Sequence, residues 1–110
     1  MKSEAWDQGV IRAKALFESY KTQNYDSLAT RLTSTKATEL SEEIISEKPR
    51  IVVSSWGQQE LDSRLAILVE ARKMPPWYGL VHRVSAYGFF LDPSGVITPM
   101  AEKDLWDHGY

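Results

Sequence analysis

The chain has 110 residues, a formal net charge of −2 and no cysteine, and 43% of its residues are hydrophobic. This length and composition are those of one folded domain whose apolar core needs no disulfide. The lack of cysteine excludes disulfides, thiolate nucleophiles and cysteine-based zinc sites. A weakly acidic chain has no large positive field to attract phosphates, so we expect no nucleic-acid partner.

No apolar signal segment begins the sequence, and no apolar run approaches the ~18 residues of a membrane span. We therefore expect a cytoplasmic protein without a membrane partner. The composition shifts once, near Pro49, and no repeat or flexible linker marks a second domain. These features predict a single domain over residues 1–110, with a helical part at 1–49 and an antiparallel sheet at 50–110.

Three helices are predicted in the first part. Residues 4–22 form an amphipathic helix, because apolar side chains recur at spacings of three and four at Trp6, Val10, Ala13, Phe17 and Tyr20. Asn24 can cap a short second helix. A third helix is predicted before Pro49, which stops it. The apolar positions of this third helix are Ala37, Leu40, Ile44 and Ile45.

After Pro49 the pattern becomes that of strands. Residues 50–56 contain three consecutive β-branched side chains, which favour a partly buried strand. Residues 62–74 fit a strand by alternation and a helix by composition. We favour the strand, because a sheet of three strands would cover three helices poorly, and the helix remains the alternative. The expected fold is α+β, with N-terminal helices packed on a curved four-stranded antiparallel sheet.

The segment from Trp77 to Met100 is the most informative part of the sequence. The turn Asp92-Pro93-Ser94-Gly95 between two apolar runs predicts a β-hairpin. The first run is apolar on both faces. Trp77, Val81, Tyr87, Phe89 and Leu91 point one way, and Tyr78, Leu80, Val84, Ala86 and Phe90 point the other. Helices readily cover one face, so we expect a ligand or a protein partner to cover the other.

Two motifs resemble the nuclear-transport-factor-2-like superfamily and its cystatin-like neighbours. Ala15-Leu16-Phe17-Glu18-Ser19-Tyr20, followed by Tyr25-Asp26-Ser27-Leu28-Ala29, is similar to the opening helices of these domains. The stretch from Phe89 to Ile97 is similar to their final hairpin. The resemblance implies a curved sheet wrapped on a helix, often with a pocket and often dimerised through sheet faces. It implies no activity, since the fold hosts many functions.

Seven residues of the β half are candidate ligand or interface contacts. Aromatic side chains are enriched at interface centres, and an arginine among apolar residues can bind a carboxylate. The seven are Trp56, Trp77, Tyr78, His82, Arg83, Tyr87 and Phe89. For catalysis, His82 is the candidate base, with Tyr78 or Tyr87 to polarise a carbonyl. No paired acid accompanies His82. No motif indicates a metal or a cofactor, so we expect no metal site and no cofactor.

Three functions from different classes follow as hypotheses. We favour a noncatalytic domain that self-associates as a homodimer through its sheet and binds a small apolar ligand or a protein. The second hypothesis is a cofactor-independent isomerase or dehydratase with His82 as base. The third is a monomeric immunity or adaptor protein. It would use the glutamates of the third helix as an acidic patch, although such residues are more often a solvated helix side; they are Glu39, Glu42, Glu43 and Glu47.

Overall fold

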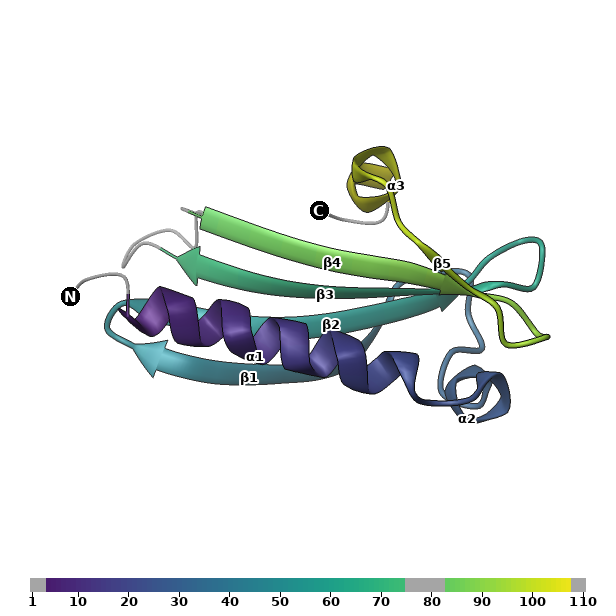
Figure 1. Ribbon diagram of the computed structural model, residues 1–110, viewed down its shortest axis with the longest axis horizontal. Helices are drawn as coiled ribbons and strands as arrows, with labels where there is room; N and C mark the ends of the chain where they lie inside the picture. Colours follow the sequence, from purple (N-terminus) through teal and green to yellow (C-terminus); the bar gives the residue numbers. More distant parts are fainter. Residues whose placement is uncertain (1–3, 75–82, 108–110) are drawn as a thin grey trace.

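A computed structural model describes residues 4–74 and 83–107 and places a long helix on one face of an antiparallel sheet (Figure 1). Helix α1 (Glu4–Lys21) and the short helix α2 (Tyr25–Ala29) come first. The strands pair in chain order in a single sheet. They are β1 (Thr38–Glu47), β2 (Arg50–Gln59), β3 (Leu65–Met74), β4 (Arg83–Leu91) and β5 (Ile97–Pro99), and helix α3 (Glu102–Asp107) follows them. We call the sheet face beneath α1 the inner face and the opposite one the outer face.

The α+β class predicted from the sequence is confirmed, but the predicted number of strands is wrong, because the sheet has five strands rather than four. The additional strand is β1, which replaces the predicted third helix, so the helical part ends well before residue 49. Two bulges interrupt the pairing of β1, at Leu40 and at Ile45. Each bulge inserts one residue, and both side chains consequently pack against the inner core although they are five positions apart. The helix-like spacing of four is that of Leu40 and Ile44, but Ile44 pairs with Val52 and lies on the outer face.

Helix α1 forms over almost the whole predicted range and buries the predicted apolar stripe in part, at Trp6, Ala13 and Tyr20. It lies close to the sheet because Gly9 has no side chain. A Cβ atom on Gly9 would lie 2.6 Å from Cγ2 of Ile51. The predicted cap of α2 is confirmed, since the Asn24 side chain accepts a hydrogen bond of 2.7 Å from the Ser27 N–H. No helix in the described ranges is long and apolar enough to cross a membrane.

The ambiguous segment 62–74 contains strand β3, as favoured. This strand lies between β2 and β4, and residues on both of its faces are buried. Burial between two neighbours and two faces outweighs the helical composition of the segment. The predicted hairpin is also confirmed. Asp92 accepts hydrogen bonds from the N–H groups of Ser94 and Val96, and Gly95 has a φ of 94°.

The alternation predicted for β4 is confirmed from residue 83 onward. Phe89 and Leu91 belong to the inner core, and Phe90 is buried on the outer face. Trp77, Tyr78, Leu80 and Val81 lie outside the described residues. The strand therefore presents apolar side chains to both faces of the sheet.

The outer face is buried within this one chain at its centre. Val52, Ser54, Ala66, Leu68, Glu70 and Phe90 are at most 6% exposed. Met100 and the α3 residue Leu105 lie close to Gly88, and a Cβ atom on Gly88 would clash with Met100. Arg64 lies over the Phe90 ring, with Cζ 4.3 Å from its centroid. Phe90 therefore needs no ligand or partner to cover it, and for the rest of the predicted face such a cover stays a prediction.

A chain of three hydroxyl groups is built into the inner face. The Tyr20 hydroxyl and Ser55 Oγ lie 2.7 Å apart, and Ser55 Oγ lies 2.7 Å from Ser41 Oγ. Tyr20 is 4% exposed and Ser55 is fully buried. These bonds connect α1, β2 and β1 through groups that would be costly to bury without partners.

Replacing Ser55 by alanine should lower the free energy of unfolding by about 1–3 kcal/mol, because the buried Tyr20 hydroxyl loses its partner. Urea denaturation monitored by tryptophan fluorescence measures the change. The double variant Ser55→Ala with Tyr20→Phe should lose less than the sum of the two single losses. Strictly additive losses would contradict a direct bond.

Candidate functional site

Trp77, Tyr78 and His82, three of the seven predicted contact residues, lie outside the described residues. The other four occupy three separate places. Phe89 is fully buried in the inner core, with its ring 5.7 Å from that of Phe17. Trp56 lies on the outer face, whereas Arg83 and Tyr87 lie on the inner side of β4. These four residues therefore do not form a single site.

Tyr87, the described member of the proton-transfer hypothesis, is used in packing. Its ring centroid lies 5.8 Å from that of Phe17, and its hydroxyl accepts a hydrogen bond of 3.0 Å from Ser85 Oγ. Within residues 4–74 and 83–107, no group of three acidic or histidine side chains is placed to hold a metal ion. The geometry of Tyr87 thus gives that hypothesis no added support.

The first candidate surface is the free edge of β4. Among the described strands, β5 pairs with residues 89–91 of β4 and leaves residues 83–87 without a neighbour on that side. Burial changes at the same point. Arg83 is exposed and residues 84–87 are half-buried, whereas residues 88–91 are buried. Within the described parts of the chain, the first five residues of β4 thus form an open sheet edge.

The backbone polarity of this edge follows from one hydrogen bond. The Met100 N–H donates to the Gly88 carbonyl at 3.0 Å, so the backbone groups of Gly88 point toward β5. Alternate residues of an antiparallel strand point their N–H and C=O groups to the same side. Val84 and Ala86 therefore direct their N–H and C=O groups to the open edge.

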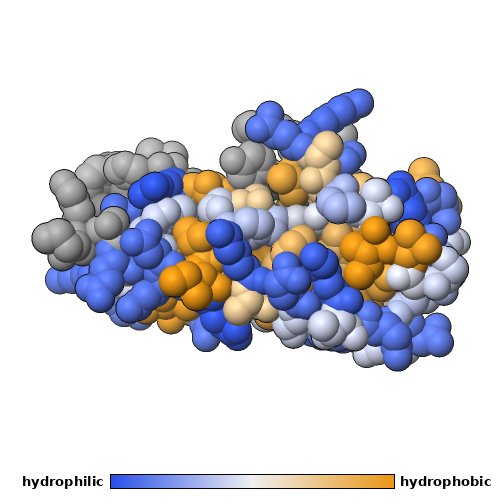
Figure 2. Space-filling view, in the orientation of Figure 1, coloured by the Kyte–Doolittle hydropathy of each residue, from blue (hydrophilic) through white to orange (hydrophobic). Residues whose placement is uncertain are grey.

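An open groove of about 670 Å³ runs between this edge and the N-terminal half of α1. The Arg83 guanidinium lies over the Trp6 ring there, with Cζ 4.9 Å from the ring centroid. Ile11 is 66% exposed, and Figure 2 shows an apolar patch over this half of α1 among charged side chains. The residues that line the groove are Trp6, Asp7, Val10, Ile11, Arg83, Val84 and Ser85.

The opposite edge of the sheet, β1, is protected against strand pairing. Its two bulges break the regular register, and four exposed glutamates lie along it: Glu39, Glu42, Glu43 and Glu47. Glu43 points to the inner side and pairs with Arg12 of α1 at 2.6 Å, whereas the other three lie on the outer side. The acidic helix patch predicted from the sequence is wrong, since these residues belong to an edge strand.

The second candidate surface is the Arg72 cluster on the outer face, which consists of Arg72, Ser54, Trp56 and Glu70. Nη2 of Arg72 donates to Ser54 Oγ at 3.0 Å, and Cζ lies 5.5 Å from the Trp56 ring centroid. Nε lies 3.9 Å from Oε1 of Glu70 and is buried without a hydrogen-bond partner among the described residues. The guanidinium is therefore held by Ser54 and Trp56 more than by Glu70.

Glu70 is a carboxylate with little access to water. Its side chain is 5% exposed. Burial raises the pKa of the Glu70 carboxyl, and the attraction of Arg72 offsets this in part. Sequence reasoning missed both residues, although charged side chains inside a strand that is otherwise apolar on both faces were the available signal.

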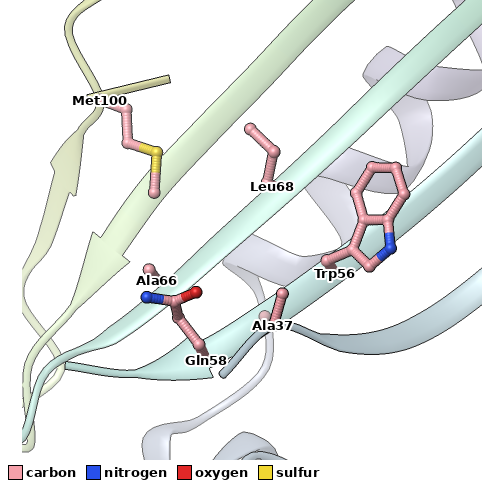
Figure 3. A pocket seen from close by; sticks show the side chains of 7 residues that line it. Ala37, Trp56, Gln58, Ala66, Leu68 and Met100 are labelled. Carbon is pink, nitrogen blue, oxygen red and sulfur yellow. The ribbon is translucent and has the colours of Figure 1, made fainter. Parts of the chain in front are cut away.

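A shallow hollow lies next to this cluster, between the side chains labelled in Figure 3. Its volume is about 10 Å³, which is room for at most one water molecule. Cavities that bind small molecules usually exceed about 300 Å³. The residues that line the hollow are Ala37, Trp56, Gly57, Gln58, Ala66, Leu68 and Met100. This part of the outer face is therefore closed to a small apolar ligand.

No protein family, curated protein or solved structure matches this chain. The nuclear-transport-factor-2-like or cystatin-like resemblance stays a prediction.

Replacing Glu70 by glutamine should change how stability depends on pH. The folded chain raises the pKa of Glu70 above its ordinary value of 4.5, so it binds this proton more tightly than the unfolded chain does. Glu70 therefore lowers stability as the pH rises through 4.5 and the raised pKa. The free energy of unfolding of Glu70→Gln, relative to that of the parent, should therefore increase when the pH is raised from about 4 to about 7.

Urea denaturation at both pH values measures this difference, and Glu39→Gln, on the exposed end of the same face, is the matched control for loss of a charge. If the Glu70→Gln variant and the parent show parallel pH profiles, burial of Glu70 has no effect on its titration.

Proposed function

We propose that this chain is a noncatalytic protein-interaction domain that works as a homodimer joined through the edge of its sheet. The observation that carries the proposal is the difference between the two edges. Exposed strand edges are templates for pairing with another chain, and proteins protect them with charges, prolines and bulges. Strand β1 has four glutamates and two bulges, whereas the free residues 83–87 of β4 carry one charge, at Arg83, with no proline and no register shift with β3.

The packing of the inner face supports a noncatalytic role. The core beneath α1 consists of apolar side chains that are at most 5% exposed. The hydroxyl groups of Tyr20, Ser41 and Ser55 bond to one another and serve the packing of α1 on the sheet. The groups beneath α1 are thus engaged in holding the fold together, and protein binding at the edge agrees with this better than chemistry in the interior does.

The low charge of the β4 edge after Arg83 favours a second copy as its occupant. A two-fold axis brings identical segments together antiparallel, so each residue must tolerate its own segment opposite. The segment Val84-Ser85-Ala86-Tyr87 meets this condition, because two copies bring no like charges together. The same pairing at β1 would oppose glutamates to glutamates.

The proposal predicts a concentration-dependent dimer of the 12.5 kDa chain. Sedimentation equilibrium or light scattering after gel filtration measures the mass. Because an edge contact is small, we expect the dimer fraction to rise between about 1 and 100 µM. A monomer throughout this range, as an immunity or adaptor protein without its partner would show, would contradict the proposed function.

A further inference from the structure

We infer that the two copies join β4 to β4 in one register, with Ser85 on the two-fold axis, to form a continuous sheet of ten strands. This inference rests on the proposed function and adds the residues that pair. Each copy contributes the five residues 83–87, because the described part of β5 occupies the same edge from Gly88 onward.

Backbone polarity selects the register. Only Val84 and Ala86, within the free segment, direct their N–H and C=O groups outward. Placing Val84 opposite the partner's Ala86 makes two symmetric hydrogen-bonded pairs and uses all of these groups. A shift by two residues one way puts Val84 opposite Gly88, whose carbonyl already accepts from Met100. A shift the other way puts Val84 opposite itself, so that one pair of the described segment bonds in place of two.

The side chains are compatible with this register. On the outer side, Val84 meets Ala86, and small apolar side chains can pack across two strands. On the inner side, Arg83 lies opposite Tyr87, whose ring can accept the guanidinium. Both α1 helices lie on the same face of the joined sheet, because the axis is perpendicular to it. The exposed Ile11 side chains therefore flank the junction.

Ser85 provides the decisive test. Facing its own copy across the axis, it forms a pair without hydrogen bonds, in which Cα atoms are about 4.5 Å apart. That distance permits a disulfide. Because the natural chain has no cysteine, Ser85→Cys carries one thiol, and so does the control Ala86→Cys, whose side chain lies on the other face opposite Val84.

Under mild oxidation, Ser85→Cys should form a covalent dimer at least about tenfold faster than Ala86→Cys, because the dimer holds its thiols at a high effective concentration. Gel electrophoresis without reductant measures both rates. Equal rates in a parent chain that is dimeric would overturn the register and leave the proposed function standing. A parent chain that is monomeric would overturn both.

A second variant tests the hydrogen bonds. The N–H of Ala86 points away from β3, so Ala86→Pro should keep the fold and weaken the dimer at least about tenfold. The N–H of Ser85 points toward β3, so Ser85→Pro should instead unfold the chain. Circular dichroism measures folding and sedimentation measures association. A folded Ala86→Pro variant that dimerises like the parent would also overturn the inference.

Discussion

The structure depends on one constraint, which is that strand β3 must be buried on both faces at once. Its inner residues pack beneath α1, and Met100 lies beside its outer residues Ala66 and Leu68. The outer sides of its neighbours are covered as well, since Arg64 lies over Phe90 and Arg72 bonds to Ser54. The other elements of the chain are arranged around this requirement. One consequence is that a carboxylate, Glu70, is held where water hardly reaches it. Burial of charged groups is unfavourable unless they are paired, and Arg72 meets that need incompletely.

The elements whose local sequence agrees with their surroundings could be predicted. Helix α1 follows from the spacing of its aromatic residues, and the last hairpin follows from Asp92 and Gly95. Strand β3 could be predicted only by weighing the whole sheet, because its composition favours a helix. Strand β1 was missed, since its two bulges break the period of two, and Leu40 and Ile44, on opposite faces of the sheet, are four positions apart as on one side of a helix.

The candidate surfaces could be predicted only in part. Arg83 lies in the groove, and Trp56 lies in the Arg72 cluster, so composition and apolar context identified individual contacts. Sequence could not show that they lie on opposite faces of the sheet. The open edge of β4 could not be predicted from the sequence for a different reason. Whether an edge is free depends on how far the neighbouring strand extends, and β5 ends at Pro99, shortly before α3 begins at Glu102.

The length of β5, which is three residues, determines how much of the β4 edge is covered within the chain. A longer final strand would pair with the outward N–H and C=O groups of Val84 and Ala86, for which the described residues show no backbone partner, and would leave no room there for a second copy. A longer strand and the proposed pairing with a second copy would then compete for the same backbone groups. A related chain with a longer β5 would thus be expected to stay monomeric, although its core would be unchanged.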